Sequence, residues 1–166
     1  MGKIYTALGL MSGTSMDGVD ASIVRSDGNR EYSIKLDKYF KYEDKIRHKI
    51  INIKDKVLLE DDLKLYSGEI KILEKEITVF HADIVNEILN ASKIEIDFLG
   101  FHGQTILHDP EKKITQQLGD GNLLSKLTKK QVIYDFRQND LKNGGQGAPL
   151  TPIYHKLLAK SFKEEG

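Results

Sequence analysis

A turn of small residues between two apolar runs near the N-terminus constrains the fold of this chain more than any other feature. The first run, Ile4–Leu10, is typical of a buried strand, and the second, Val19–Val24, follows at hairpin distance. Between them lies Ser12-Gly-Thr-Ser15, and Gly18 directly precedes the second run. The pattern predicts two paired strands whose tip carries hydroxyls, free backbone N–H groups and glycines.

Two interpretations of this tip are open from the residues alone. A concave run of backbone N–H donors binds phosphate oxygens, and Gly13, Thr14 and Ser15 offer such a run together with two hydroxyls. Asp17 and Asp20 would then hold Mg²⁺ through water, or would pin the turn. The alternative is an ordinary hairpin turn built from Gly, Ser and Asp. A Walker A loop is excluded, because no Gly-Lys-Ser/Thr closes the segment.

Composition excludes several classes of protein. The chain has 166 residues, enough for one modest core, with 25 basic and 25 acidic residues. This balance gives no reason to expect a nucleic-acid or membrane partner. The lack of cysteine excludes disulfides and cysteine-ligated metals. No apolar run reaches the ~20 residues of a membrane span, and the N-terminus lacks the pattern of a signal peptide. We therefore expect a cytoplasmic protein.

The rest of the chain alternates helical and strand patterns, which is typical of an α/β fold. Strands are expected over Tyr32–Phe40, Ile94–Phe101, Ile114–Leu118 and Gln131–Phe136. Helices are expected around Ile46–Val57, over about Asp62–Ala91, over Leu123–Leu127 and after Pro149. The charged stretch Lys54–Asp62 predicts a solvated loop. His81, beside the stripe of the long helix, is interpreted as structural.

Polar clusters follow the predicted strands of the second half, and ligands collect at the carboxyl ends of strands in α/β sheets. His102, Gln104 and Thr105 come where a strand is expected to end, and a glutamine amide can both donate to and accept from a sugar hydroxyl. The alternative is a packed turn with a structural histidine. Asp135 and Arg137 should point the same way on a strand. With Asp140 they would hold a substrate oxyanion, or they would form a buried ion pair.

A glycine-rich run, Gly144-Gly-Gln-Gly-Ala148, directly precedes the last helix. The free N–H groups and the helix dipole would bind an anion or a hydroxyl, which makes Gly145, Gln146 and Gly147 candidate ligand contacts. The alternative is a flexible loop. A metal site is not assigned, since the candidate ligands match no template in their spacing. Those candidates are His102, His108, Asp109 and Asp120.

Four motifs in order closely resemble the anhydro-N-acetylmuramic acid kinases, enzymes of bacterial cell-wall recycling. They are Met11-Ser-Gly-Thr-Ser-Met-Asp-Gly-Val-Asp20, Gly100-Phe-His-Gly-Gln-Thr105, Gln117-Leu-Gly-Asp-Gly-Asn122 and Asp135-Phe-Arg-Gln-Asn-Asp-Leu-Lys-Asn-Gly-Gly-Gln-Gly-Ala-Pro-Leu150. The resemblance covers essentially the whole chain. It implies the sugar kinase, actin and heat-shock ATPase fold, with two ribonuclease-H-like α/β domains around a cleft.

The resemblance also implies a reaction and a site. Such kinases open the 1,6-anhydro ring of the amino sugar with water and phosphorylate the 6-oxygen from ATP, with Mg²⁺. The ATP-phosphate loop would be Gly13, Thr14, Ser15, Met16, Asp17, Gly18, Val19 and Asp20. The sugar side of the cleft would be lined by His102, Gln104, Thr105, Asp135, Arg137, Asp140, Gly145, Gln146 and Gly147.

One part of the family pattern has no counterpart in residues 1–166. The general base of the family is the aspartate of an Asp-x-Gly-Pro-Gly-Asn loop, which this sequence lacks. We therefore assign no catalytic residue and expect that base beyond Gly166, with the second domain outside this chain. The isolated chain should be inactive, and its last helix should expose Ile153, Leu157 and Leu158.

Two alternative functions remain open. The chain would be a non-catalytic sugar- or phosphate-binding protein, or it would be one half of a split kinase. The partner would then be a second copy of the chain, or a complementing chain that carries the missing loop.

Overall fold

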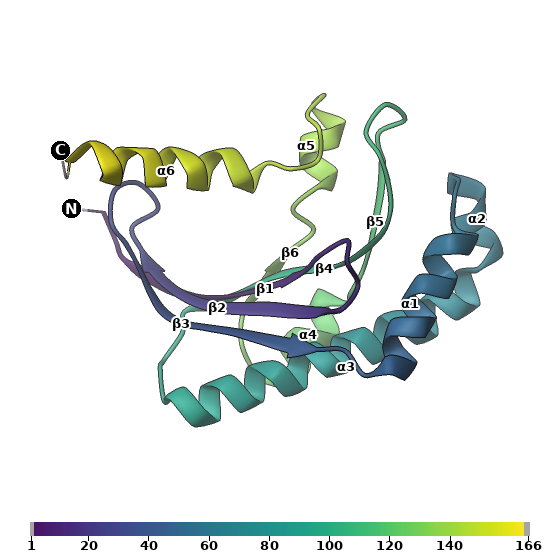
Figure 1. The fold of residues 1–166 in the computed structure, drawn as a ribbon, viewed down its shortest axis with the longest axis horizontal. Helices are drawn as coiled ribbons and strands as arrows, with labels where there is room; N and C mark the ends of the chain where they lie inside the picture. The colour runs from purple at the N-terminus through teal and green to yellow at the C-terminus, as the bar shows by residue number, and fades with distance from the viewer. Residues whose placement is uncertain (1, 165–166) are drawn as a thin grey trace.

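A curved β-sheet with helices on both faces forms the centre of the molecule (Figure 1). The computed structural model describes residues 2–164, with side chains described through Ala159. Its strands are β1 (Tyr5–Ser12), β2 (Gly18–Ser26), β3 (Tyr32–Lys41), β4 (Phe98–Asp109), β5 (Ile114–Leu118) and β6 (Val132–Tyr134). Its helices are α1 (Asp44–Lys56), α2 (Glu60–Leu65), α3 (Ser67–Ser92), α4 (Gly121–Thr128), α5 (Gln138–Lys142) and α6 (Leu150–Glu164).

The strand order confirms the expected α/β class. The first three strands form an antiparallel meander, and β1 then pairs in parallel with β4. On its other side the beginning of β4 pairs in parallel with β6, while its later part pairs antiparallel with β5. Three antiparallel strands followed by two parallel ones agree with the ribonuclease-H-like arrangement that the resemblance implies.

The hydrophobic core lies between one face of the sheet and the helices α1, α3 and α4. Leu8, Val19 and Ile23 of the sheet and Ile77 and Ile88 of α3 are fully buried there. Buried residues alternate with more exposed ones along β2, and the buried residues of α3 follow the i, i+3, i+4 spacing of an amphipathic helix. In the ribbon α5 and α6 lie over the opposite face of the sheet (Figure 1).

The expected long helix over Asp62–Ala91 is wrong in one respect, because two helices, α2 and α3, meet at Tyr66. The backbone of Tyr66 is not helical, with φ −99° and ψ 16°. The Asp62 carboxylate accepts the N–H groups of Leu58 and Leu59, which starts α2 at Glu60. The loop is therefore shorter than the predicted range Lys54–Asp62 and consists of the few residues between α1 and α2.

The strand expected to end near Phe101 instead continues as β4 to Asp109. Its later part has a pairing partner in β5, so the glycine-containing motif lies inside a strand and not after one. Ile94–Asp97, expected to open this strand, precede it. The helix α5, which follows β6, was not predicted from the sequence, where a loop was expected.

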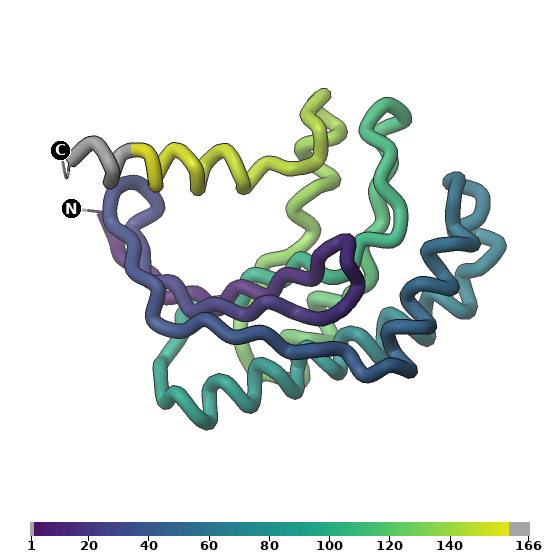
Figure 2. Tube along the Cα trace, viewed as in Figure 1, coloured from purple at the N-terminus to yellow at the C-terminus, as the bar shows by residue number. Residues whose placement is uncertain are grey.

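The last helix confirms only part of the predicted apolar surface. The side chain of Ile153 is 61% exposed, whereas that of Leu157 is only 9% exposed and Leu158 is half-buried. The helix is held against the start of β3, where the rings of Tyr154 and Tyr32 meet edge to face at 6.2 Å. The tube trace shows this proximity of α6 to the β2–β3 turn (Figure 2).

Candidate functional site

The tip of the β1–β2 hairpin has the geometry of a tight, supported loop. Thr14 and Ser15 are exposed at the tip, and Gly13 is half-buried. Met16 takes a left-handed conformation, with φ +54°, and its N–H donates to the Gly13 carbonyl at 3.2 Å. The Met16 side chain is buried in the core, as is Val19. Thr14 and Ser15 are therefore accessible at the tip, while the buried side chains of Met16 and Val19 hold the loop to the sheet.

Asp17 and Asp20 lie on different parts of this hairpin. The Asp17 carboxylate accepts a hydrogen bond from the Ser15 hydroxyl at 2.5 Å, and this bond lowers the pKa of Asp17. The Tyr39 hydroxyl and the charge of Arg47 act in the same direction. Asp20 is exposed on β2. Both carboxylates are thus available beside the loop.

Gln104 was expected at the end of a strand, but it lies in the interior of the protein. Its side chain is fully buried inside β4. Its Nε2 donates to the Gly13 carbonyl at 3.0 Å, and its Oε1 accepts from the Ser12 hydroxyl at 2.5 Å. Gln104 therefore contacts the hairpin tip, and its buried amide is not placed to touch a sugar directly.

His102 and Arg137 form the centre of a second cluster. Nε of Arg137 donates to Nε2 of His102 at 2.8 Å, and Nη1 donates to the Gly147 carbonyl at 2.7 Å. Nδ1 of His102 lies 2.8 Å from the Gly103 carbonyl and donates to it when Nε2 accepts from Arg137. Burial, and secondarily the Arg137 charge, lower the pKa of His102. The imidazole is thus held in its neutral form.

Asp140 completes this cluster through the glycine-rich loop. Its Oδ2 accepts the N–H of Gly147 at 2.7 Å, and its backbone carbonyl accepts the N–H of Gly145 at 2.8 Å. A Cβ on Gly145 would overlap with the Asp140 carboxylate, which would have to move away from the Gly147 N–H. The run before α6 is consequently an anchored loop and not a free connection.

The expected shared orientation of Asp135 and Arg137 is wrong, because β6 ends at Tyr134. Asp135 adopts a left-handed conformation with φ +58°, and Arg137 has helical backbone angles at the start of α5. The side chain of Asp135 lines a polar cavity of about 420 Å³. His102, Gln117 and Gln138 line the same cavity.

A larger cavity extends from the second cluster to Asp20 on β2, without reaching Gly13–Gly18 at the hairpin tip. Its volume is about 580 Å³, and it lies between the sheet, the glycine-rich loop and the start of α6. Asp20 lines it from β2, His102 from β4 and Arg137 from the segment before α5. His102 thus stands between this cavity and the polar one.

The remaining predicted residues lie at the margin. The Thr105 hydroxyl accepts a hydrogen bond from Gln117 at 3.3 Å, and Gln146 is exposed. Among the side chains that the structure describes, which end at Ala159, no three His, Cys, Asp or Glu residues are grouped so as to hold a metal ion. A magnesium ion commonly binds through one or two carboxylates together with phosphates and water, which Asp17 and Asp20 fit.

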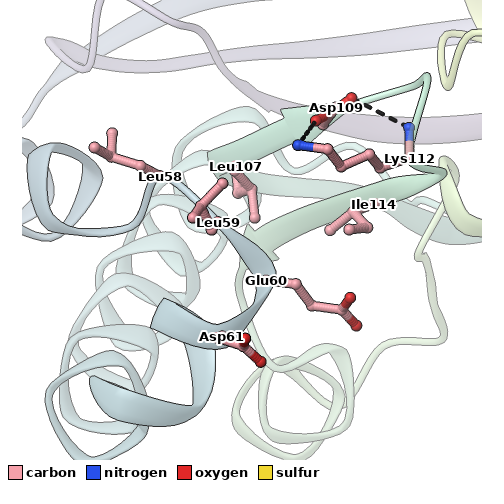
Figure 3. Close-up of a pocket in the computed structure, with 8 residues that line it drawn as sticks. All are labelled: Leu58, Leu59, Glu60, Asp61, Leu107, Asp109, Lys112 and Ile114. Carbon is pink, nitrogen blue, oxygen red and sulfur yellow. Dashed lines mark hydrogen bonds and ion pairs between the residues drawn. The ribbon is translucent and has the colours of Figure 1, made fainter.

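Another cavity, of about 240 Å³, lies apart from these residues (Figure 3). It is found between the start of α2 and the β4–β5 hairpin, with Leu59, Leu107 and Ile114 on its walls. The ammonium group of Lys112 pairs with Asp109 at 3.1 Å at its rim. None of the predicted ATP or sugar residues lines it.

One contributor to the site, Tyr42, was not predicted from the sequence. Tyr42 is buried, and its hydroxyl lies 2.8 Å from the Ser12 hydroxyl beneath the hairpin tip. Its backbone N–H donates to the Asp17 carbonyl at 2.8 Å. The only signal of this role is a polar-tipped aromatic residue between a strand and a helix, which is too common to indicate a site.

Comparison with known proteins decides the family. The profile of the anhydro-N-acetylmuramic acid kinases matches residues 5–165. This chain belongs to the anhydro-N-acetylmuramic acid kinase family. It is 55% identical over 165 residues to the anhydro-N-acetylmuramic acid kinase of Pelagibacter ubique, covering 99% of this chain and 44% of that protein. The corresponding kinase of Rhizobium etli is 40% identical over 169 residues, covering 100% of this chain and 46% of that protein.

The chain thus spans less than half the length of these relatives. Within the part that the structure describes, no helix is long and apolar enough to cross a membrane.

Proposed function

We propose that this chain is the N-terminal part of an anhydro-N-acetylmuramic acid kinase and that it supplies the phosphate loop and one wall of the sugar site. In the proposed reaction, water opens the 1,6-anhydro ring and the freed 6-oxygen takes the γ-phosphate of ATP. The product is N-acetylmuramic acid 6-phosphate, and ATP as donor implies a cytoplasmic site of action.

One observation carries the proposal. The cavity of about 580 Å³ is lined both by Asp20, from the hairpin that would bind ATP, and by His102 and Arg137, from the motifs that would bind the sugar. A kinase must bring its two substrates into one place, because phosphoryl transfer depends on positioning and charge stabilisation.

Each group has a proposed role. The backbone N–H groups of Gly13, Thr14 and Ser15 would contact phosphate oxygens, and Asp17 and Asp20 would hold Mg²⁺ through water. The metal would neutralise charge on the phosphates when bound. His102 and Arg137, with the Gly145–Gly147 loop, would contact the sugar, and Asp135 and Asp140 would orient these groups. The general base and the second domain would come from the remainder of the kinase.

A binding experiment on the chain tests the two halves of the site separately. We expect MgATP to shift the backbone amide resonances of Gly13–Asp20 in ¹⁵N-labelled chain. The anhydro-sugar should shift those of His102, Arg137 and Gly147. A chain that binds neither ligand, or binds both only at other residues, would contradict the proposal.

A further inference from the structure

The pairing of β4 with β1 is irregular beside the phosphate loop. Leu10 is opposite Phe101 and Ser12 is opposite Gln104, so β4 carries one residue more than β1 between these pairs. Gly103 takes a left-handed conformation within this step, with φ +72°. A Cβ at Gly103 would overlap with the Leu118 carbonyl of β5. The step is a β-bulge that requires glycine.

The bulge changes where the next side chain points. Residues three apart on a regular strand face opposite sides of the sheet, yet Phe101 and Gln104 are both buried. His102, between them, lines the cavity of about 580 Å³. The extra residue thus turns Gln104 inward, against the base of the hairpin, while His102 stays at the cavity wall.

In this inward orientation, both the oxygen and the nitrogen of the Gln104 amide form hydrogen bonds. Oε1 accepts from the Ser12 hydroxyl at 2.5 Å, and Nε2 donates to the Gly13 carbonyl at 3.0 Å and to the Thr105 carbonyl at 3.2 Å. The Ser12 hydroxyl in turn lies 2.8 Å from that of Tyr42. Burial raises the pKa of Tyr42 to about 12, so its hydroxyl remains a neutral donor.

The Gly13 carbonyl is the point where this network meets the loop. It accepts from Gln104 and also from the N–H of Met16, the bond that closes the tip. Fixing this carbonyl fixes the plane of the Gly13–Thr14 peptide, and therefore the direction of the Thr14 N–H donor, which lies in the same plane. A buried donor aimed at the turn is a means of preorganising an anion-binding loop.

We propose that Gln104, aimed by the bulge at Gly103, is a positioning residue that sets the conformation of the phosphate loop. The proposal rests on the proposed function in one respect, namely that this loop binds phosphate. It gives Gln104 a role toward the nucleotide in place of the direct sugar contact expected from its motif. Because His102 precedes the bulge and Gln104 follows it, β4 also fixes the loop relative to the cavity wall.

The first test measures the loop itself in the intact chain. Gln104→Met keeps the length of the side chain and removes its hydrogen bonds. We expect hydrogen exchange at the Met16 amide to accelerate about tenfold or more, as for the loss of a buried hydrogen bond. Titrated with MgATP, this variant should bind about tenfold more weakly than the wild type. Gln131→Met is the matched control, because Gln131 is exposed, and it should change neither value.

The second test separates a positioning role from general packing. Gln104→Glu keeps the size of the side chain and its acceptor toward Ser12, but places an oxygen against the Gly13 carbonyl. The new carboxyl can donate to that carbonyl only when it is protonated. MgATP binding and Met16 protection should therefore recover as the pH falls through the pKa of this carboxyl, whereas Gln104→Met should show no such recovery.

The outcomes distinguish the proposal from its premise. Wild-type exchange at Met16 in folded Gln104→Met, with protected α3 amides such as Val85 unchanged, would overturn the role of Gln104. If Gln104→Met does not fold, Ser12→Ala removes the partner of Oε1 and is expected to have the same effects. If wild-type chain shows no shifts with MgATP, the phosphate role fails, and the exchange measurement alone decides whether Gln104 positions the turn.

Discussion

Arg137 joins two segments that are far apart in the sequence, with Nε donating to Nε2 of His102 at 2.8 Å and Nη1 donating to the Gly147 carbonyl at 2.7 Å. The planar guanidinium makes both bonds at once, which fixes the distance between β4 and the glycine-rich loop. Arg137 therefore links two parts of the cavity wall, His102 on β4 and the loop that Asp140 also anchors.

Replacing this side chain by another cation tests the geometry. A lysine in Arg137→Lys keeps the charge but has no fork, so it cannot hold His102 and Gly147 together. We expect at least about tenfold weaker binding of the anhydro-sugar, the cost of about one lost charge-assisted hydrogen bond, measured by calorimetric titration. Arg25→Lys is the matched control, since Arg25 is exposed on β2. Equal sugar affinities of the two variants would contradict the role of Arg137.

Removing the charge of Arg137 should change the pKa of the neighbouring His102 imidazole. Burial lowers the pKa of His102 first, and the Arg137 charge lowers it further. In Arg137→Gln the charge is absent, so the pKa of His102 should rise toward its ordinary value. A pH titration of the His102 ring resonances by NMR measures this change. An unaltered or lower pKa would show that the guanidinium does not act on this ring.

The buried histidine of α3 should make the fold sensitive to acid. His81 is fully buried, and burial lowers its pKa from 6.5 to about 4. The unfolded chain therefore binds a proton that the folded chain excludes between these values. Stability from this group is complete above about pH 6.5 and falls as the pH drops toward 4, by on the order of 3 kcal/mol.

Urea unfolding of the wild type and of His81→Leu between pH 7 and pH 4 measures this contribution. The free energy of unfolding of the wild type should fall relative to that of His81→Leu as the pH drops, because the leucine takes no proton. His155 is exposed on α6, so His155→Leu should keep the wild-type acid sensitivity. A His81→Leu protein with the full wild-type loss of stability would refute this explanation.

Two glycines provide opposite expectations for the same substitution. A methyl group in Gly145→Ala would overlap with the Asp140 carboxylate, which holds the Gly147 N–H. We expect a loss of about 1–3 kcal/mol in the free energy of unfolding. Gly68 lies in α3 with open space around its Cβ position, so Gly68→Ala should gain about 0.5–1 kcal/mol. Thermal unfolding of both variants compares them directly. An unchanged free energy of unfolding in Gly145→Ala would show that the loop rearranges to accommodate the methyl group.

The meander and its tip could be predicted from the sequence because local signals agree there. Alternation in Val19–Val24 and the small residues before it indicate a strand and a turn without reference to the rest of the chain. The end of β4 could not be predicted in this way. Gly103 would ordinarily indicate a strand end, and only the pairing with β5 converts it into a bulge.

In the candidate site, too, some features could be predicted from the sequence and others could not. His102 and Arg137 were expected at one site from their motifs, and the structure brings them into direct contact. The burial of Gln104 and the support from Tyr42 depend on the register of β4 against β1 and on the packing of the β3–α1 junction. Such contacts between distant segments have no local pattern in the sequence. For the same reason the exposure of Leu157 was wrong, because its burial arises from contacts of α6 with the folded chain.

The most direct measurement is the kinase activity of a chimaera in which this chain replaces the matching segment of the Pelagibacter ubique relative, which is 55% identical to it. We expect the chimaera to release ADP only when the anhydro-sugar is present and to form a sugar 6-phosphate visible by ³¹P NMR. The isolated chain should do neither, because in our proposal the general base and the second domain, which would close the site and exclude water, come from the remainder of the kinase. A folded chimaera that binds MgATP yet releases no sugar-dependent ADP would contradict our assignment of this chain to the kinase.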